Sequence, residues 1–350
     1  MSGYSVSGGS ARSWVPVRVA DIGGWTDTWF ARHGDILNIG VLCRYFGRRA
    51  PFRGVEVSVD AQKRQAGEAL ISIMAADPVF DVEIETASLL AGEFNRQNLL
   101  LATLSLLPLE KLTEFDLGIR IMSPIPPGAS LGTSAAVSVG LITALRHISP
   151  DEAARLAWRA ETEIMGGQSG TQDQWSAAYL PGIHRIAIPN YPKTHLRPIE
   201  ITAATKQSLE EGLVTVFVGT HNSSDTHQMV IAELEREGNN SPRLQKLRDL
   251  AQPAEEALTA GNLAEFGQVM TANTAAQEAL HPALIGAGHR LVIDLGRSAD
   301  ALGWKVNGAG AGGGSVTVLF AGRKEAAAFC DAAAPFFKTR GFLPFEHRLA

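Results

Sequence analysis

A run of glycine, proline and small hydroxyl residues in the middle of the chain has the composition of an anion-binding loop. Residues 124–136 read Pro-Ile-Pro-Pro-Gly-Ala-Ser-Leu-Gly-Thr-Ser-Ala-Ala, and an apolar stretch follows. Gly128 and Gly132 let the backbone turn sharply near a ligand, and Thr133 or Ser134 is expected to cap a buried helix. Because exposed N–H groups at a helix N-terminus favour phosphate, a phosphate-binding loop is predicted. A plain glycine turn before a core helix is the alternative.

A second group of polar residues lies near the N-terminus. Arg18 occurs inside a β-branched run that predicts a strand. Burial of an unpaired charge is costly, so this arginine is either paired or on a solvent-exposed edge. The strand ends in a double glycine, and the loop after it carries Trp25, Thr26 and Asp27.

A third group follows the apolar stretch. Ser149 and Pro150 mark a helix start, and the helix is expected to include Glu161 and Glu163. Asp173 lies in the polar segment beyond it, for which a solvated turn is the alternative interpretation.

The other patterns predict a mixed α and β chain. Strands are expected at 34–42, 54–60, 82–84, 117–121 and 213–219, and a glycine run at 308–314 leads into a further strand. Helices are expected at 98–107, 244–258 with a break or kink at Pro253, 263–280, and 324–334 ended by Pro335. Prolines at 189, 192 and 198 predict an irregular crossing, which divides the chain into domains 1–190 and 191–350.

Composition excludes several classes of protein. The chain has 350 residues, 45% of them hydrophobic and 19% charged, as in a globular protein. A net charge of -5 disfavours a nucleic-acid partner, and no apolar run is long enough for a membrane span. The two cysteines lack ligand spacing, which fits a cytoplasmic protein. Nothing fixes the oligomeric state, and a homodimer is one option.

Known motifs are also missing. There is no Gly-x-x-x-x-Gly-Lys-Ser/Thr, so a P-loop is excluded. A dinucleotide-binding turn needs a helix after its glycines, whereas a strand is expected after residue 314. His221 and His227 show no metal spacing and are interpreted as surface or substrate-loop residues.

Taken in order, the three groups resemble the motifs of the GHMP kinases, the superfamily of galactokinase, homoserine kinase, mevalonate kinase and phosphomevalonate kinase. The stretch from Pro126 to Ala136 is similar to the family's Pro-x-x-x-Gly-Leu-Gly-Ser-Ser-Ala-Ala, with Ser130 and Thr133 as departures. The run Asn307-Gly-Ala-Gly-Ala-Gly-Gly-Gly is similar to its third motif. The resemblance implies a two-domain α+β fold with the active site in the cleft between the domains.

Two segments resemble the sugar kinase branch. Arg18-Val-Ala-Asp-Ile-Gly-Gly-Trp-Thr-Asp27 looks like the first motif of fucokinases and D-glycero-D-manno-heptose 7-phosphate kinases, whereas mevalonate-type members carry a lysine in this region. Gly170-Thr-Gln-Asp-Gln-Trp-Ser-Ala-Ala178 resembles the central heptose kinase segment. The resemblance implies a kinase that uses ATP and Mg²⁺ to phosphorylate a hydroxyl, expected to be the anomeric one, of a sugar or sugar phosphate.

The resemblance also implies roles. Asp173 would orient or deprotonate the hydroxyl, and Arg18 would pair with it. Trp25, Thr26 and Asp27 would hold the sugar, and Mg²⁺ would take Ser134 and Glu161, with Glu163 as the rival ligand. The ATP phosphates would lie on Gly128, Ser130, Leu131, Gly132, Thr133 and Ser134. The late glycine run would place four residues near the substrate and the phosphates: Gly308, Gly310, Gly312 and Gly313.

Three alternatives stay open. The chain can be a catalytically silent sugar- and nucleotide-binding regulator on the same fold, or another GHMP small-molecule kinase. An oxidoreductase that uses the late glycine run is the third. Arg44, Arg48, Arg49 and Arg53 are either a subsite for a substrate phosphate or a solvated face.

Overall fold

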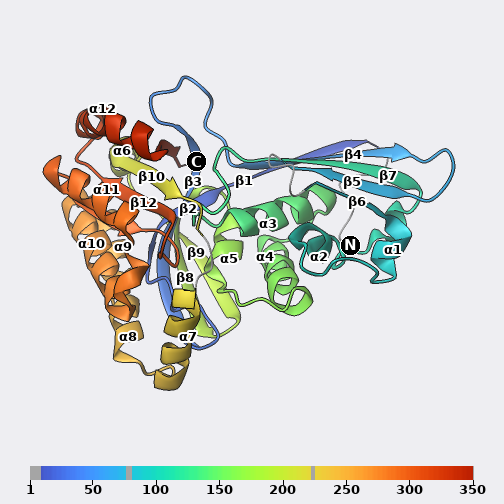
Figure 1. Ribbon diagram of the computed structural model, residues 1–350, viewed down its shortest axis with the longest axis horizontal. Coiled ribbons are helices and arrows are strands. Elements are labelled where there is room, and N and C mark those ends of the chain that lie inside the picture. Colours follow the sequence, from blue (N-terminus) through green and yellow to red (C-terminus); the bar gives the residue numbers. More distant parts are fainter. Residues whose placement is uncertain (1–8, 76–80, 222–224, 350) are drawn as a thin grey trace.

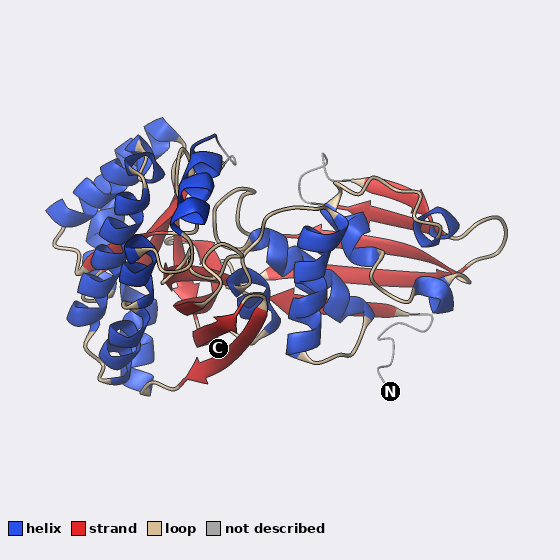
Figure 2. Ribbon diagram, turned by 90° about the horizontal axis from the view of Figure 1, so that it is seen from below, coloured by secondary structure: helices blue, strands red, loops and turns tan. Residues whose placement is uncertain are grey.

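The computed structural model describes residues 9–75, 81–221 and 225–349. It is an α+β protein with two sheets, as predicted (Figure 1). In Figure 2, helices cover one face of the sheet on the right, and a second layer of helices lies at the left of the view.

The smaller sheet has the strand order β1-β4-β7-β5-β6. Its pairs are antiparallel except β5 with β7, which are parallel. Apolar residues alternate with exposed ones along β4, as expected for a sheet with one covered face. The strands are β1 (Ser10–Val15), β4 (Val55–Lys63), β5 (Leu70–Met74), β6 (Val82–Glu85) and β7 (Phe115–Met122).

The larger sheet has eight strands in the order β11-β12-β10-β13-β3-β8-β9, with β2 paired to β3 beside this path. Strand β3 is long enough to pair with β2, β8 and β13. The strands are β2 (Val17–Ile22), β3 (Gly34–Tyr45), β8 (Gly182–Asn190), β9 (Lys193–Ile199), β10 (Leu213–Gly219), β11 (Gly303–Val306), β12 (Gly314–Leu319) and β13 (Leu343–Arg348).

Helices that contact the smaller sheet come from the first half of the chain. The buried helix α3 packs on β1 and β4, and it also contacts α2, α4 and α5. The segments are α1 (Thr86–Leu90), α2 (Leu99–Leu104), the 3₁₀ helix η2 (Leu109–Leu112), α3 (Thr133–Leu145), α4 (Pro150–Arg159), the π-helical segment η3 (Ala160–Ile164) and α5 (Gln172–Ala178).

Helices of the second half pack on the larger sheet, where α10 contacts β11 and β2. They are α6 (Ala203–Gly212), α7 (Asp225–Glu237), α8 (Pro242–Arg248), α9 (Ala251–Thr259), α10 (Leu263–Leu280), the 3₁₀ helix η4 (Pro282–Leu284), α11 (Ala287–Ser298) and α12 (Arg323–Arg340).

Most expected elements are confirmed, and several details are wrong. The 187–198 segment belongs to an antiparallel hairpin of β8 and β9, with one register shift between Ala187 and Asn190, and it is not a crossing between domains. The helix break precedes Pro253, which lies in the first turn of α9. Pro335 lies inside α12 instead of ending it. The division at residue 190 stays a prediction, since the larger sheet contains strands from both sides of it.

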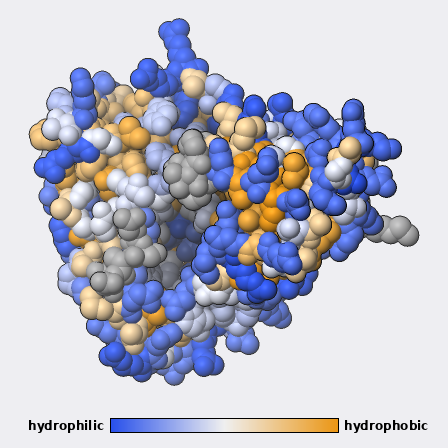
Figure 3. Space-filling view, turned by 45° about the vertical axis from the view of Figure 1, so that its right-hand side comes forward, coloured by the Kyte–Doolittle hydropathy of each residue, from blue (hydrophilic) through white to orange (hydrophobic). Residues whose placement is uncertain are grey.

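The face in Figure 3 is mainly hydrophilic, with a broad apolar area to the right of its centre and smaller apolar spots on its left. In the portion of the chain that the structure describes, no helix has the length and hydropathy needed to cross a membrane.

Candidate active site

Side chains from the three sequence groups meet in space. Arg18 on β2 donates from Nε to Oδ1 of Asp173 on α5 at 2.8 Å, and from a terminal nitrogen to the Ser130 carbonyl at 2.7 Å. The backbone N–H of Gly308 lies 3.1 Å from both carboxylate oxygens of Asp21. The glycine turn is also tied to the first loop, because the Ser315 hydroxyl donates to the Ala129 carbonyl at 2.7 Å.

A bulge in β2 explains why two of these charges share one face. The pairing of β2 with β3 shifts register between Val19 and Ile22, and Ala20 between them has φ +51°. In a regular strand Arg18 and Asp21 would point to opposite faces, but a bulge re-aims one side chain. Their side chains therefore lie 3.5 Å apart, both buried. Sequence reasoning missed Asp21, because a bulge leaves no plain pattern.

Arg18 is buried and paired, so the solvent-edge alternative is wrong. Burial lowers the pKa of Arg18, but the carboxylates of Asp173 and Asp21 outweigh this and raise it above its usual value. Asp173 lies at the start of α5 and keeps 29% of its side chain exposed, so the solvated-turn alternative is also wrong. It is thus a carboxylate held by a fixed cation at the surface of a cavity.

The 128–134 loop has the backbone of an anion-binding turn. Gly128, Ser130 and Gly132 have φ of +70°, +58° and +71°. Ser130 is a non-glycine residue in the left-handed region, which is uncommon and concentrates at functional sites. The prediction that Thr133 or Ser134 caps α3 is wrong: the cap residue is Gly132, which provides no side-chain bond. The first N–H groups of the helix are therefore left for a ligand.

Ser134 and Glu161 come together beside this helix end. Burial raises the pKa of Glu161 to about 7, and the nearby side chains of Ser169, Gln174 and Ser134 partly offset this effect. Oε1 of Glu161 and Oγ1 of Thr133 are buried and have no hydrogen-bond partner. Glu163 lies on the outside of η3, where it pairs with Arg159 at 2.7 Å.

These oxygens fit Mg²⁺, which takes few protein ligands and keeps phosphate oxygens and waters. The structure favours Glu161 over Glu163 because only Glu161 faces the phosphate loop. The described residues contain no cluster of three or more His, Cys, Asp or Glu side chains that would hold a metal by themselves.

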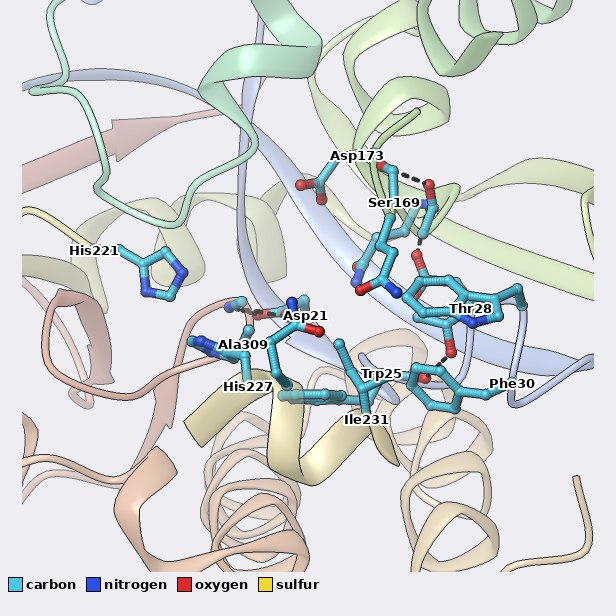
Figure 4. A pocket seen from close by; sticks show the side chains of 18 of the residues that line it. Asp21, Trp25, Thr28, Phe30, Ser169, Asp173, His221, His227, Ile231 and Ala309 are labelled. Atoms are coloured by element: carbon cyan, nitrogen blue, oxygen red, sulfur yellow. Dashed lines mark hydrogen bonds between the residues drawn. The ribbon is translucent and has the colours of Figure 1, made fainter. Parts of the chain in front are cut away.

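A cavity of about 590 Å³ lies next to the Arg18–Asp173 pair. Figure 4 shows the Asp173 carboxylate on one side of it and Trp25, His227 and Ile231 on the opposite side. The cavity lies within the size range of small-molecule sites. Its lining also includes Asp21, Asp27, Thr28, Trp29, Phe30, Gly166 to Gly170, Gln172, His221, Gln228, Gly308 and Ala309.

The predicted sugar-binding residues are only partly in this cavity. Trp25 lines it with φ +78°, and its Nε1 is buried without a partner. Asp27 lines it too, but its Oδ2 accepts the N–H groups of Thr171 and Gln172 at 2.9 Å. Burial raises the pKa of Asp27 to about 6, with Asp173 adding to the effect. Thr26 is fully buried outside the cavity and donates to the Gly23 carbonyl, so it shapes the turn instead of contacting a ligand.

Of the late glycines, Gly308 lines the cavity, and a Cβ there would lie 3.0 Å from the Ser130 Cβ. Gly310 and Gly313 instead pack against the carbonyls of Leu284 and Thr220, and Gly312 is exposed with open space around it. Of these four glycines, only Gly308 lines the cavity, and their predicted position near substrate and phosphates stays a prediction.

His221 and His227, interpreted from the sequence as surface or substrate-loop residues, both line the cavity, and the ring of His227 stacks on Trp25 with centroids 6.0 Å apart. Lys305 is buried beside the site and lies 3.4 Å from Asp21. Sequence reasoning gave Lys305 no role at the site. The four arginines 44, 48, 49 and 53 do not line the cavity.

Residues 98–180 match the GHMP kinase N-terminal domain. Similar proteins include the bifunctional fucokinase/GDP-fucose pyrophosphorylase of Arabidopsis thaliana, 27% identical over 86% of this chain and 29% of that protein. A mevalonate kinase of Thermococcus sibiricus is 27% identical over 56% of this chain and 57% of its own length. The D-glycero-alpha-D-manno-heptose 7-phosphate kinase of Campylobacter jejuni is 24% identical over 56% of this chain and 59% of that protein.

Two solved structures share the fold along almost the whole chain. The Lactococcus lactis galactokinase complexed with galactose has a TM-score of 0.71 at 16% identity, covering 97% of this chain and 93% of its own. The D-glycero-D-manno-heptose 1-phosphate kinase from Bacteroides thetaiotaomicron has a TM-score of 0.66 at 19% identity, covering 97% of each chain.

The fold and the matched relatives are thus those of small-molecule kinases. The chain carries the GHMP kinase N-terminal domain, and the predicted resemblance to this superfamily is confirmed. Its aligned part spans between about a third and three fifths of the curated relatives named above.

Proposed function

We propose that the protein is an ATP-dependent sugar kinase that phosphorylates a hydroxyl, expected to be the anomeric one, of fucose, a heptose, a heptose phosphate or a related sugar. The observation that carries this proposal is the position of the Arg18–Asp173 pair. It lies between the helix end at Gly132, which has no side-chain cap, and a cavity large enough for a monosaccharide.

Phosphoryl transfer depends mainly on positioning and on neutralising charge. In the proposed reaction the sugar hydroxyl donates a hydrogen bond to Asp173. The hydroxyl oxygen forms a bond to the γ-phosphorus as the bond to the ADP oxygen breaks, and the hydroxyl proton passes to Asp173. Arg18 holds the Asp173 carboxylate in position by donating to it, and it adds positive charge beside the transferred group.

The N–H groups at the start of α3 and the 128–134 loop would bind the ATP phosphates. Ser134 and Glu161 would hold Mg²⁺, which neutralises phosphate charge when bound. Gly132 lets this loop approach the acceptor side, because a Cβ there would lie 3.2 Å from Cγ of Asp173.

A screen for ADP release tests the proposal. Purified protein with Mg·ATP is incubated with free sugars, sugar phosphates and mevalonate, and ATP binding is followed separately by titration calorimetry. We expect ADP release with at least one sugar or sugar phosphate. Bound ATP without ADP release from any sugar would overturn the assignment, and turnover of mevalonate alone would indicate a different GHMP activity.

A further inference from the structure

The charges around the cavity are mostly negative. Its lining contains three carboxylates, those of Asp21, Asp27 and Asp173, and a single basic side chain, Arg18. Arg18 is already engaged by Asp173, Asp21 and the Ser130 carbonyl. The residues that the structure leaves undescribed contain no lysine or arginine in the sequence, so every strong cation of the chain is among the described residues.

The two histidines do not supply a positive charge either. Burial lowers the pKa of His227 to about 4 and also lowers that of His221, so both rings are neutral near pH 7. Nearby Lys305 is fully buried behind Asp21, where it donates to Oε1 of Gln277 at 3.0 Å. A phosphate on the acceptor would thus enter a cavity without a free cation.

The side of the cavity opposite Asp173 has groups suited to a neutral polyol. Trp25, Phe30 and Ile231 form an apolar wall there (Figure 4). Trp25 Nε1 is a buried donor and Gln172 Oε1 a buried acceptor, and neither has a partner. Hydroxyl groups are suited to such partners, because a hydroxyl both donates and accepts.

We infer that the acceptor is an unphosphorylated, uncharged monosaccharide whose apolar face lies on Trp25 and Ile231. This inference rests on the proposed kinase function and narrows it, since it excludes sugar phosphates and carboxylate acceptors. The carboxylates that line the cavity repel such anions, and among the described lining residues no lysine or arginine is free to offset their desolvation.

Matched pairs of acceptors test the inference. Each free hexose or heptose is compared with the same sugar phosphorylated on its terminal carbon, and kcat/KM is measured from ADP release at saturating Mg·ATP. We expect the best free sugar to exceed its phosphate at least 100-fold. A preference for the phosphate, or values within tenfold of each other, overturns the inference while the kinase function stands. No turnover of either class overturns both.

A charge-gain variant tests the physical reason. Gln228 lines the cavity from α7 and is exposed, so Gln228→Arg adds a cation without the desolvation cost of burying a charge. We expect Gln228→Arg to raise kcat/KM for the sugar phosphate by roughly tenfold, which corresponds to the lower end of the free-energy range of a hydrogen bond to a charged group. The control Met229→Arg adds the same charge at a neighbouring residue that is 51% exposed and outside the cavity. The inference is contradicted if both variants raise kcat/KM for the sugar phosphate equally, or if neither variant raises it.

Discussion

Replacement of Asp173 by asparagine separates the chemistry of this side chain from its structural role. The amide has the same shape, and its oxygen can still accept from Nε of Arg18, which now lies 2.8 Å from Oδ1. Arg18 also keeps Asp21 and the Ser130 carbonyl as partners. The fold and ATP binding should thus change little. We expect the Kd of ATP to stay within about threefold of the wild-type value, a change in binding free energy below the roughly 1.4 kcal/mol of a tenfold change.

The expected loss is in kcat. A positioned general base contributes roughly 10²- to 10⁴-fold, which is about 2.7–5.4 kcal/mol of activation free energy at 1.36 kcal/mol per factor of ten. The assay is ADP release with the best sugar of the screen, with ATP affinity measured by calorimetry.

The matched control is Asp151→Asn. Asp151 supports the same helix α5 from outside the cavity, by accepting from Nε1 of Trp175 at 3.0 Å. If kcat of Asp173→Asn falls less than tenfold, or no more than that of the control, Asp173 has no special part in the reaction.

Three further predictions follow from the site. Glu161→Gln should raise the Mg²⁺ concentration for half-maximal activity at least tenfold, whereas Glu163→Gln on the outside of η3 should leave it within twofold; equal effects would reject Glu161 as the ligand. Because burial raises the native pKa of Asp27 from 3.8 to about 6, this group favours the native state at low pH and its contribution is lost as pH rises through about 4 to 6. Urea unfolding should show Asp27→Asn gaining up to about 3 kcal/mol over wild type between pH 4 and 7, and no pH-dependent difference would contradict this. Gly132→Ala forces a Cβ into the left-handed region and against Asp173, so calorimetry should show a destabilisation of about 1–2 kcal/mol with a lower kcat; an unchanged Tm would be inconsistent with this backbone.

Some elements were predictable because their signal is local. Strand β10 and helix α10 have the bounds that the sequence patterns indicate, since an apolar run and a helical repeat specify them without tertiary contacts. The end of α12 was not predictable from a local signal, because Pro335 lies inside the helix. The helix α12 continues past it because Phe329, Ala333 and Phe337 bury one continuous face, which offsets the lost hydrogen bond.

The sequence by itself determined the order of the motifs, and with it the resemblance to GHMP kinases and the candidates Arg18, Asp173 and Glu161. Only the tertiary structure decided how these residues are used. The bulge at Ala20 brings Asp21 beside Arg18, and Glu161 is held by Ser169 and Gln174, whereas Glu163 pairs with Arg159. The bulge and these contacts depend on how the folded chain packs, which residue spacing does not encode. The same holds for the electrostatics of the cavity, because whether a charge is free or neutralised depends on partners that are distant in the chain.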